Sequence, residues 1–162
     1  MKKVWIILLI MLMMTGCGCT ETFDTIADEY IIPVSAETRQ TVVAMPEEAS
    51  VMTAQTDYGI ICLCDGYEIL TETFPSGDLD RTICNVTGYH PDELTGLETV
   101  QNGFRRHDMV WCSAGEQGNR LGRAAILDDG NYYYVLTVIA DEENSGGISA
   151  EVDQLFSSFE LE

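Results

Sequence analysis

The sequence predicts an α+β fold in which a single antiparallel sheet of about six to eight strands is covered by helices. The turn dipeptides at residues 65–66, 102–103 and 129–130 are Asp-Gly, Asn-Gly and Asp-Gly, and each lies between runs of β-forming residues. That arrangement is typical of β-hairpins. The apolar residues of the last segment instead recur at helical spacing, at Val152, Leu155, Phe156 and Phe159.

The chain begins with Lys2 and Lys3, followed by an apolar run of 11 residues at positions 4–14. This run is shorter than the ~20 residues that a helix needs to cross the hydrocarbon core, so residues 1–16 are predicted to be a signal peptide. The following Met14-Thr15-Gly16-Cys17 resembles the lipobox of bacterial lipoproteins, with Met14 where leucine is more usual. An ordinary secretory signal with an incidental cysteine is the alternative.

The lipobox resemblance implies that Cys17 becomes the lipidated first residue of the mature chain. A diacylated cysteine holds a protein stably at a membrane, so we expect a lipid-anchored protein on the extracytoplasmic face of the cell membrane. Residues 17–37 are polar and acidic and are predicted to form a tether, with a short helical or extended piece at 23–32. Residues 38–162 are long enough to form one α+β domain with its own core.

The elements of this domain follow from its turns and its periodicity. Two strands are predicted first, then a hairpin around residues 65–66, a central helix with Ser76 or Asp78 as its N-cap, a four-stranded meander and a closing amphipathic helix. The predicted ranges are 41–45 and 51–56 for the first strands, 77–87 for the central helix, about 96–140 for the meander and 148–159 for the last helix.

The last hairpin predicts which side chains share a face. A two-residue loop at 129–130 places Leu127 opposite Tyr132 and Arg123 opposite Leu136. Both faces of this hairpin are apolar, so both need cover from helices.

Three neighbouring residues of this hairpin carry further expectations. Gly122 and Ala124 are small and lie on one face, where they leave room for a helix to lie close. Arg123 lies on the opposite, apolar face, where an unpaired charge is costly. We therefore expect Arg123 to pair with a carboxylate or to contact a ligand.

The charge of the chain restricts its partners. The whole sequence carries 27 acidic residues against 8 lysines and arginines, a formal net charge of −19. Removal of residues 1–16 takes away both lysines, so the mature side-chain charge is 6 − 27 = −21. Such a surface repels nucleic acid and anionic lipid headgroups and favours cations or basic proteins as partners.

The cysteines suggest little chemistry. Cys62 and Cys64 share one side of a predicted strand, but Cys-x-Cys alone lacks the paired spacing of structural zinc sites, so no metal ligands are assigned. One structural disulfide and buried free thiols are both compatible with an exported protein. The pairing stays open among Cys19, Cys62, Cys64, Cys84 and Cys112.

Calcium binding and hydrolysis are weaker alternatives. The acidic stretches at 128–131 and 141–144 offer several oxygens, but neither matches an EF-hand loop. The first is better explained as a turn and the second as a solvated loop. His107 and Ser113 lie too far apart along one strand to act together, and no Gly-x-Ser-x-Gly motif is present. No catalytic residue and no cofactor are therefore predicted.

The order of elements, with paired strands, a central helix, a meander and a closing helix that ends Phe156-Ser157-Ser158-Phe159, resembles the Mog1/PsbP-like α+β sandwich over roughly residues 38–161. Members of that group are mostly small binding or assembly factors without catalytic residues. The resemblance implies the same kind of function here, and no functional residue is carried over by position.

These observations favour a membrane-anchored, non-catalytic module that binds a small ligand or another envelope protein. Aromatic side chains with a polar edge suit such contacts, and they lie on neighbouring predicted strands next to one cation. An enzyme or a divalent-metal-dependent factor of the envelope is the alternative. The candidate ligand contacts are Trp111, Arg123, Tyr132 and Tyr134. Filling of the core is the favoured explanation for the three aromatic rings, and a structural salt bridge is favoured for Arg123.

Overall fold

The structure is a computed structural model that describes residues 37–51, 59–115 and 118–162. The predicted signal peptide, the predicted lipobox with Cys17 and nearly all of the predicted tether lie outside these residues. The elements in chain order are β1 (Thr41–Val42), β2 (Ser50–Val51), β3 (Gly59–Cys64), β4 (Tyr67–Pro75), α2 (Leu79–Thr87), the 3-10 helix η1 (Pro91–Glu93), β5 (Thr95–Gln101), β6 (Phe104–Gly115), β7 (Gly118–Asp128), β8 (Tyr132–Asp141), α3 (Glu142–Ser158) and β9 (Glu160–Leu161).

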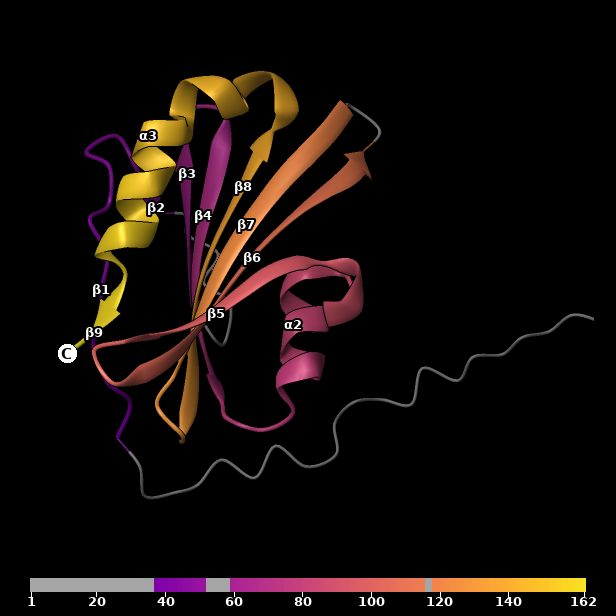
Figure 1. Cartoon of the computed structure of the whole chain (residues 1–162). Coiled ribbons are helices and arrows are strands. Elements are labelled where there is room, and N and C mark those ends of the chain that lie inside the picture. The colour runs from indigo at the N-terminus through magenta and orange to yellow at the C-terminus, as the bar shows by residue number, and fades with distance from the viewer. Residues whose placement is uncertain (1–36, 52–58, 116–117) are drawn as a thin grey trace, which may run out of the picture. The chain divides into compact units, whose positions relative to one another are not determined.

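The domain is α+β, as predicted, but its strands form two sheets rather than one. Seven antiparallel strands are ordered β2-β3-β4-β8-β7-β6-β5, and β1 pairs with β9 in a separate two-stranded sheet (Figure 1). The sequence analysis missed β9, a short extended segment after α3 that takes β1 away from the main sheet. The predicted strand at 51–56 is observed only in its first residue, as part of β2, and 52–56 lie outside the described residues.

Two of the three predicted hairpins have the predicted register. Cys64 pairs with Tyr67 across Asp65-Gly66, and Gln101 pairs with Phe104 across the loop at 102–103. At that second loop both residues have positive φ, 51° for Asn102 and 89° for Gly103, as a type I′ turn requires.

The predicted register of the third hairpin is wrong by two residues. Leu127 pairs with Tyr134 and Arg123 with Val138, because the Asp129 side chain accepts hydrogen bonds from the backbone N–H groups of Asn131 and Tyr132 and lengthens the turn. Side chains alternate with a period of two along a strand, so the shift leaves each residue on its predicted face.

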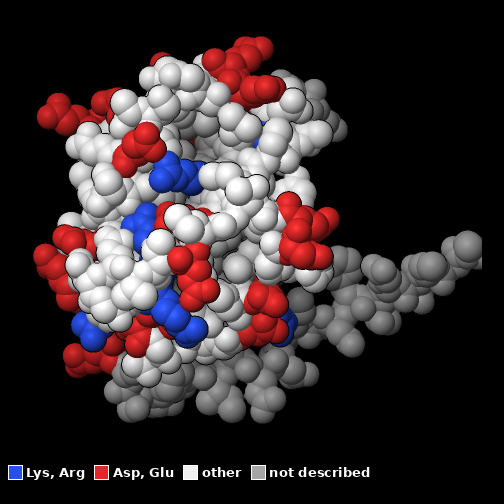
Figure 2. Space-filling model, viewed as in Figure 1, with Lys and Arg blue, Asp and Glu red and all other residues white. Residues whose placement is uncertain are grey.

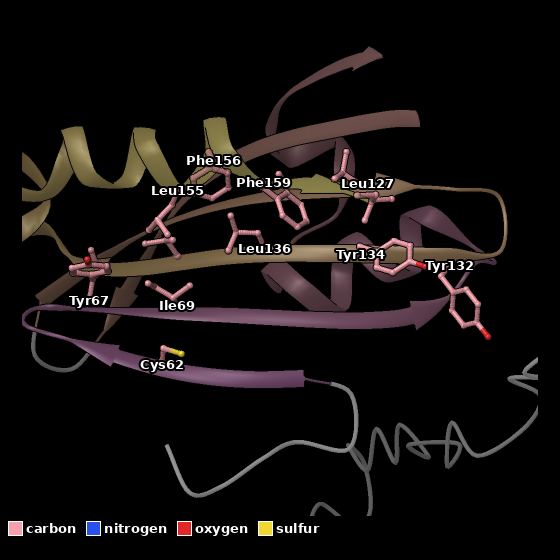
Figure 3. Close-up of a cluster of buried hydrophobic side chains, with 14 residues drawn as sticks. Cys62, Tyr67, Ile69, Leu127, Tyr132, Tyr134, Leu136, Leu155, Phe156 and Phe159 are labelled. Carbon is pink, nitrogen blue, oxygen red and sulfur yellow. The ribbon is translucent and has the colours of Figure 1, made fainter. Parts of the chain in front are cut away.

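Helices cover both faces of the sheet, as the apolar residues on both faces of the last hairpin predicted. Figure 1 shows α3 along one face, here called the α3 face, and α2 on the opposite side, the α2 face. On the α3 face, Leu155, Phe156 and Phe159 point at Leu136 of β8 (Figure 3), and all four are at most 1% exposed. The core on the α2 face is formed by Ile83, Met109, Ala124, Ile126, Tyr133 and Val135.

Both helices end within one residue of the prediction, but their starts differ: α2 begins at Leu79 rather than at residue 77, and α3 begins six residues before the predicted start at 148. Asp78 caps α2, as expected, and its side chain accepts from the backbone N–H of Arg81 at 3.2 Å. Helix α3 begins at Glu142, so the solvated loop predicted at 141–144 is wrong, and Asp141 is instead the N-cap residue. Acidic residues in a first helical turn interact favourably with the positive end of the helix dipole, which explains the earlier start.

Candidate functional site

A cavity of about 420 Å³ lies between the first half of α3 and strands β6, β7 and β8. Figure 2 shows the surface hollowed between α3 and these strands. The volume falls within the ~300–1,000 Å³ typical of small-molecule sites. Most of the wall is apolar and is formed by Val110, Leu121, Val138, Ala140, Ile148 and Val152.

The cavity exists because α3 changes character along its length. Its second half carries Leu155 and Phe156, which are almost fully buried against the sheet. Two of the residues with which its first half lines the cavity, Ser145 and Ser149, are small and leave space above the strands. Val110 on β6 is consequently 47% exposed at the cavity wall.

One end of the cavity is polar. Arg123 Nη1 donates to Asp153 Oδ1 at 2.7 Å, and the guanidinium lies 4.2 Å from the ring centroid of Phe156. Asp153 is therefore the carboxylate partner that the position of Arg123 predicted. The Arg123 side chain is 33% exposed and lines the cavity.

A second, shallower hollow shares Arg123 and Asp153 with the cavity and reaches Arg106. Arg106 is only 8% exposed and donates to both carboxylate oxygens of Asp108, at 2.8 Å each, and to the carbonyl oxygens of Phe156 and Phe159. A cation that binds the last carbonyls of a helix compensates their unpaired acceptors. Arg106 thus ties the end of α3 to β6, a role that the sequence signals only as one arginine among six.

The predicted aromatic residues do not form one surface. Tyr132 and Tyr134 belong to the core of the α3 face, where Tyr134 is fully buried, accepts from the backbone N–H of Arg39 and donates to Asp129. Burial raises the pKa of the Tyr134 hydroxyl, which keeps it protonated as a donor. Trp111 lies on a strand that lines the cavity, but its ring packs on the α2 face.

The acidic turn at 128–131 is occupied by protein groups. Asp128 forms an ion pair with Arg105, and Asp129 forms one with Arg39 besides its contacts within the turn. These partners support the interpretation of this stretch as a structural turn. Among the described residues, no group of three or more histidine, cysteine or acidic side chains could hold a metal ion.

The four described cysteines are free thiols. Cys62 and Cys64 pack at the core of the α3 face, and burial raises the pKa of both thiols, which makes them less reactive at neutral pH. Cys112 is exposed and lines the cavity. Cys19 lies outside the described residues.

The fold and the site together define an α+β sandwich with an apolar cavity under its C-terminal helix. No protein-family model matches the sequence, and no curated protein matches it. Solved structures do match the fold. LpqN of Mycobacterium tuberculosis, involved in cell envelope biogenesis, has a TM-score of 0.53 at 12% identity, covering 76% of this chain and 84% of LpqN.

Two further structures are similar. Cyanobacterial PsbP from Synechocystis has a TM-score of 0.50 at 8% identity, over 80% of this chain and 96% of that protein. The Ran-binding protein Mog1p of Saccharomyces cerevisiae has a TM-score of 0.48 at 9% identity, over 78% and 96%. LpqN and PsbP confirm the PsbP-like fold that the element order predicted.

Within the described residues, no helix is long and apolar enough to cross a membrane.

Proposed function

We propose that this protein is a non-catalytic binding module of the cell envelope that holds a small, largely apolar ligand in the cavity beneath α3. The observation that carries the proposal is a preformed 420 Å³ space with an apolar wall and a polar end. Ligand sites are commonly built in this way, because the apolar wall supplies affinity and a few polar groups fix orientation.

The polar end restricts the ligand further. Arg123 offers a guanidinium on a partly exposed side chain, and Asp153 offers a carboxylate on a side chain that is 73% exposed. A donor and an acceptor side by side suit an uncharged or zwitterionic group. The formal net charge of −19 disfavours ligands with several negative charges. The expected ligand therefore has an apolar body and a neutral or zwitterionic end.

Binding is favoured over catalysis by the composition of the wall. The residues lining the cavity include the nucleophile candidates Cys112, Ser145 and Ser149 but no histidine that could act as a general base. The carboxylate at the cavity, Asp153, is paired with Arg123 rather than with one of these nucleophiles.

The location in the envelope is supported by two observations. The apolar run at positions 4–14, which precedes Cys17, is too short to span a bilayer and has the form of a lipoprotein signal. LpqN, which shares the fold, is involved in envelope biogenesis. We therefore propose that lipidated Cys17 holds the domain at the extracytoplasmic face of the cell membrane. Cell fractionation of Cys17→Ser tests this: release of the variant into the soluble fraction is expected, and retention at the membrane contradicts it.

Ligand binding can be tested with the neutral apolar dye N-phenyl-1-naphthylamine, whose fluorescence increases in an apolar site. Ser149→Trp places a large ring at the cavity, while Ala150→Trp places the same ring on the next residue of α3, which does not line it. Both positions are exposed, so neither change disturbs the core.

The wild type and Ala150→Trp should bind the dye equally, and Ser149→Trp should bind at least about tenfold more weakly. Far-ultraviolet circular dichroism and thermal melting confirm that both variants are folded. Equal binding by the two variants would show that the dye does not occupy this cavity. Turnover of a substrate that requires Cys112 or His107 would instead support the enzyme alternative.

A further inference from the structure

Strand β5 forms an open edge of the main sheet. It is the last strand in the order β2-β3-β4-β8-β7-β6-β5 and pairs with β6 over all seven of its residues, Thr95 to Gln101. The strand at the other edge, β2, has two residues. Among the described residues, β5 therefore presents the longer edge to solvent.

The edge lacks the features that usually prevent strand addition. Its sequence, Thr-Gly-Leu-Glu-Thr-Val-Gln, contains no lysine and no proline, and its register with β6 runs without a bulge. Six of its seven residues are exposed, with Leu97 at 63% and Val100 at 73%. A long, regular edge with exposed apolar side chains is suited to pairing with another strand.

The hairpin identifies the backbone groups that are available. The turn at 102–103 makes Gln101 and Phe104 a hydrogen-bonded pair, because a two-residue loop closes on such a pair. Hydrogen-bonded and non-hydrogen-bonded pairs alternate along an antiparallel ladder. The N–H and C=O groups of Gly96, Glu98 and Val100 consequently point away from β6.

The charge around this edge is negative. Glu98 lies on β5 itself, and Asp92 lies on η1 immediately before it; both side chains are exposed. The nearby arginines form ion pairs with other carboxylates: Arg105 with Asp128, and Arg106 with Asp108. A strand that approaches this edge therefore meets unneutralised carboxylates.

We propose that the outer edge of β5 binds an extended, basic segment of a partner protein by β-strand addition. Backbone hydrogen bonds to Gly96, Glu98 and Val100 supply affinity. The exposed side chains of Leu97 and Val100 lie on opposite faces of β5, so each contacts side chains on its own face of the added strand. A second copy of this chain fits less well, because each copy carries a formal net charge of −19. This binding is independent of the cavity beneath α3.

The test uses a short synthetic peptide in which lysine alternates with threonine and valine, and a second peptide with glutamate in place of lysine. Each is added to the isotope-labelled domain, and the backbone amide signals are followed by NMR. The lysine peptide should shift the outward amides of Gly96, Glu98 and Val100 more than the inward amides of Leu97 and Thr99. The glutamate peptide should leave all of them unchanged.

Two variants at one position complete the test. Val100→Pro removes an outward N–H without breaking the ladder to β6, whereas Val100→Thr keeps that N–H and the β-branched shape. Affinity for the lysine peptide should fall at least about tenfold in Val100→Pro and change little in Val100→Thr, with both variants folded by circular dichroism. The proposal is overturned by absence of binding, by equal binding of the two peptides, by an undiminished affinity of Val100→Pro, or by self-association through β5 in sedimentation.

Discussion

The indole ring of Trp111 lies directly against Gly122, the residue that pairs with it across β6 and β7. A Cβ atom at position 122 would lie 2.1 Å from Trp111 Cε2, closer than real Cβ atoms approach other atoms. The sequence analysis expected a helix to use the space at Gly122 and Ala124. Ala124 does belong to the core beneath α2, but the space at Gly122 is filled by the Trp111 ring.

Gly122→Ala should therefore destabilise the domain. The added methyl group forces the ring of Trp111 to move, and overpacking of this kind costs about 1–3 kcal/mol. Denaturant unfolding measures the change. Gly96→Ala is the control, because a Cβ there has its nearest contact at 3.4 Å and lies on the exposed strand β5.

A double variant separates this clash from strand propensity. If the Trp111 ring causes the loss, Gly122→Ala should cost little in a Trp111→Ala background. An equal cost in both backgrounds would assign the effect to the backbone instead.

Phe156→Ala should remove a central part of the core on the α3 face. Phe156 is 1% exposed, and truncation of a buried phenylalanine costs about 3–5 kcal/mol. The exposed neighbour Ser157→Ala should stay within about 0.5 kcal/mol of the wild type. An equally stable Phe156→Ala, measured by denaturant unfolding, would be incompatible with this packing of α3.

The two members of the Arg123–Asp153 ion pair should differ in importance. Asp153→Asn removes an exposed ion pair and should cost less than about 1 kcal/mol, an effect that added salt reduces. Arg123→Ala should cost more, because the side chain also packs over the ring of Phe156. Unfolding at low and high salt distinguishes the two contributions. If Arg123→Ala and Asp153→Asn lowered the free energy of unfolding by the same amount at each salt concentration, the contact of Arg123 with the Phe156 ring would add nothing.

Glu72 should make stability depend on pH. Burial raises the pKa of its carboxyl above the ordinary value, so the folded state binds its proton more tightly than the unfolded state does. Stability is then lost as the pH rises from the ordinary carboxyl pKa through the raised one. Glu72→Gln should remove this loss and be more stable than the wild type at neutral pH.

The exposed Glu98→Gln provides the comparison, since it replaces a carboxyl of the same kind outside the core. Denaturant unfolding at a series of pH values gives the free energy of unfolding as a function of pH. This dependence should become weaker in Glu72→Gln and stay unchanged in Glu98→Gln. The same pH profile for Glu72→Gln and the wild type would contradict the assigned cause.

Much of the fold could be predicted from local signals. Turn dipeptides located the hairpins, the residue types on both faces of β7 and β8 required helices on both sides, and Asp78 marked the start of α2. The two-residue shift at the last hairpin could not be predicted, because it depends on hydrogen bonds that the Asp129 side chain makes within the turn.

Less of the candidate site than of the fold could be predicted from the sequence. Arg123 was recognised because a charge on an apolar face needs a partner, but Asp153 could be chosen only once α3 was placed over β7. The cavity itself results from small residues in the first half of α3, whose effect depends on how closely the rest of the helix approaches the sheet. Tyr132 and Tyr134 looked suitable for ligands, yet the same apolar character places them in the core.

Strand β8 joins the two halves of the sheet, since it pairs with β4 on one side and with β7 on the other. Within the described residues, α3 and β9 follow it in the chain. A chain that emerges from a ribosome or an export channel starting at its N-terminus cannot unite the hairpin of β3 and β4 with the rest of the sheet until Tyr132 and the residues after it are free. The edge of β4 that faces β8 therefore stays unpaired until the residues of β8 have been synthesised.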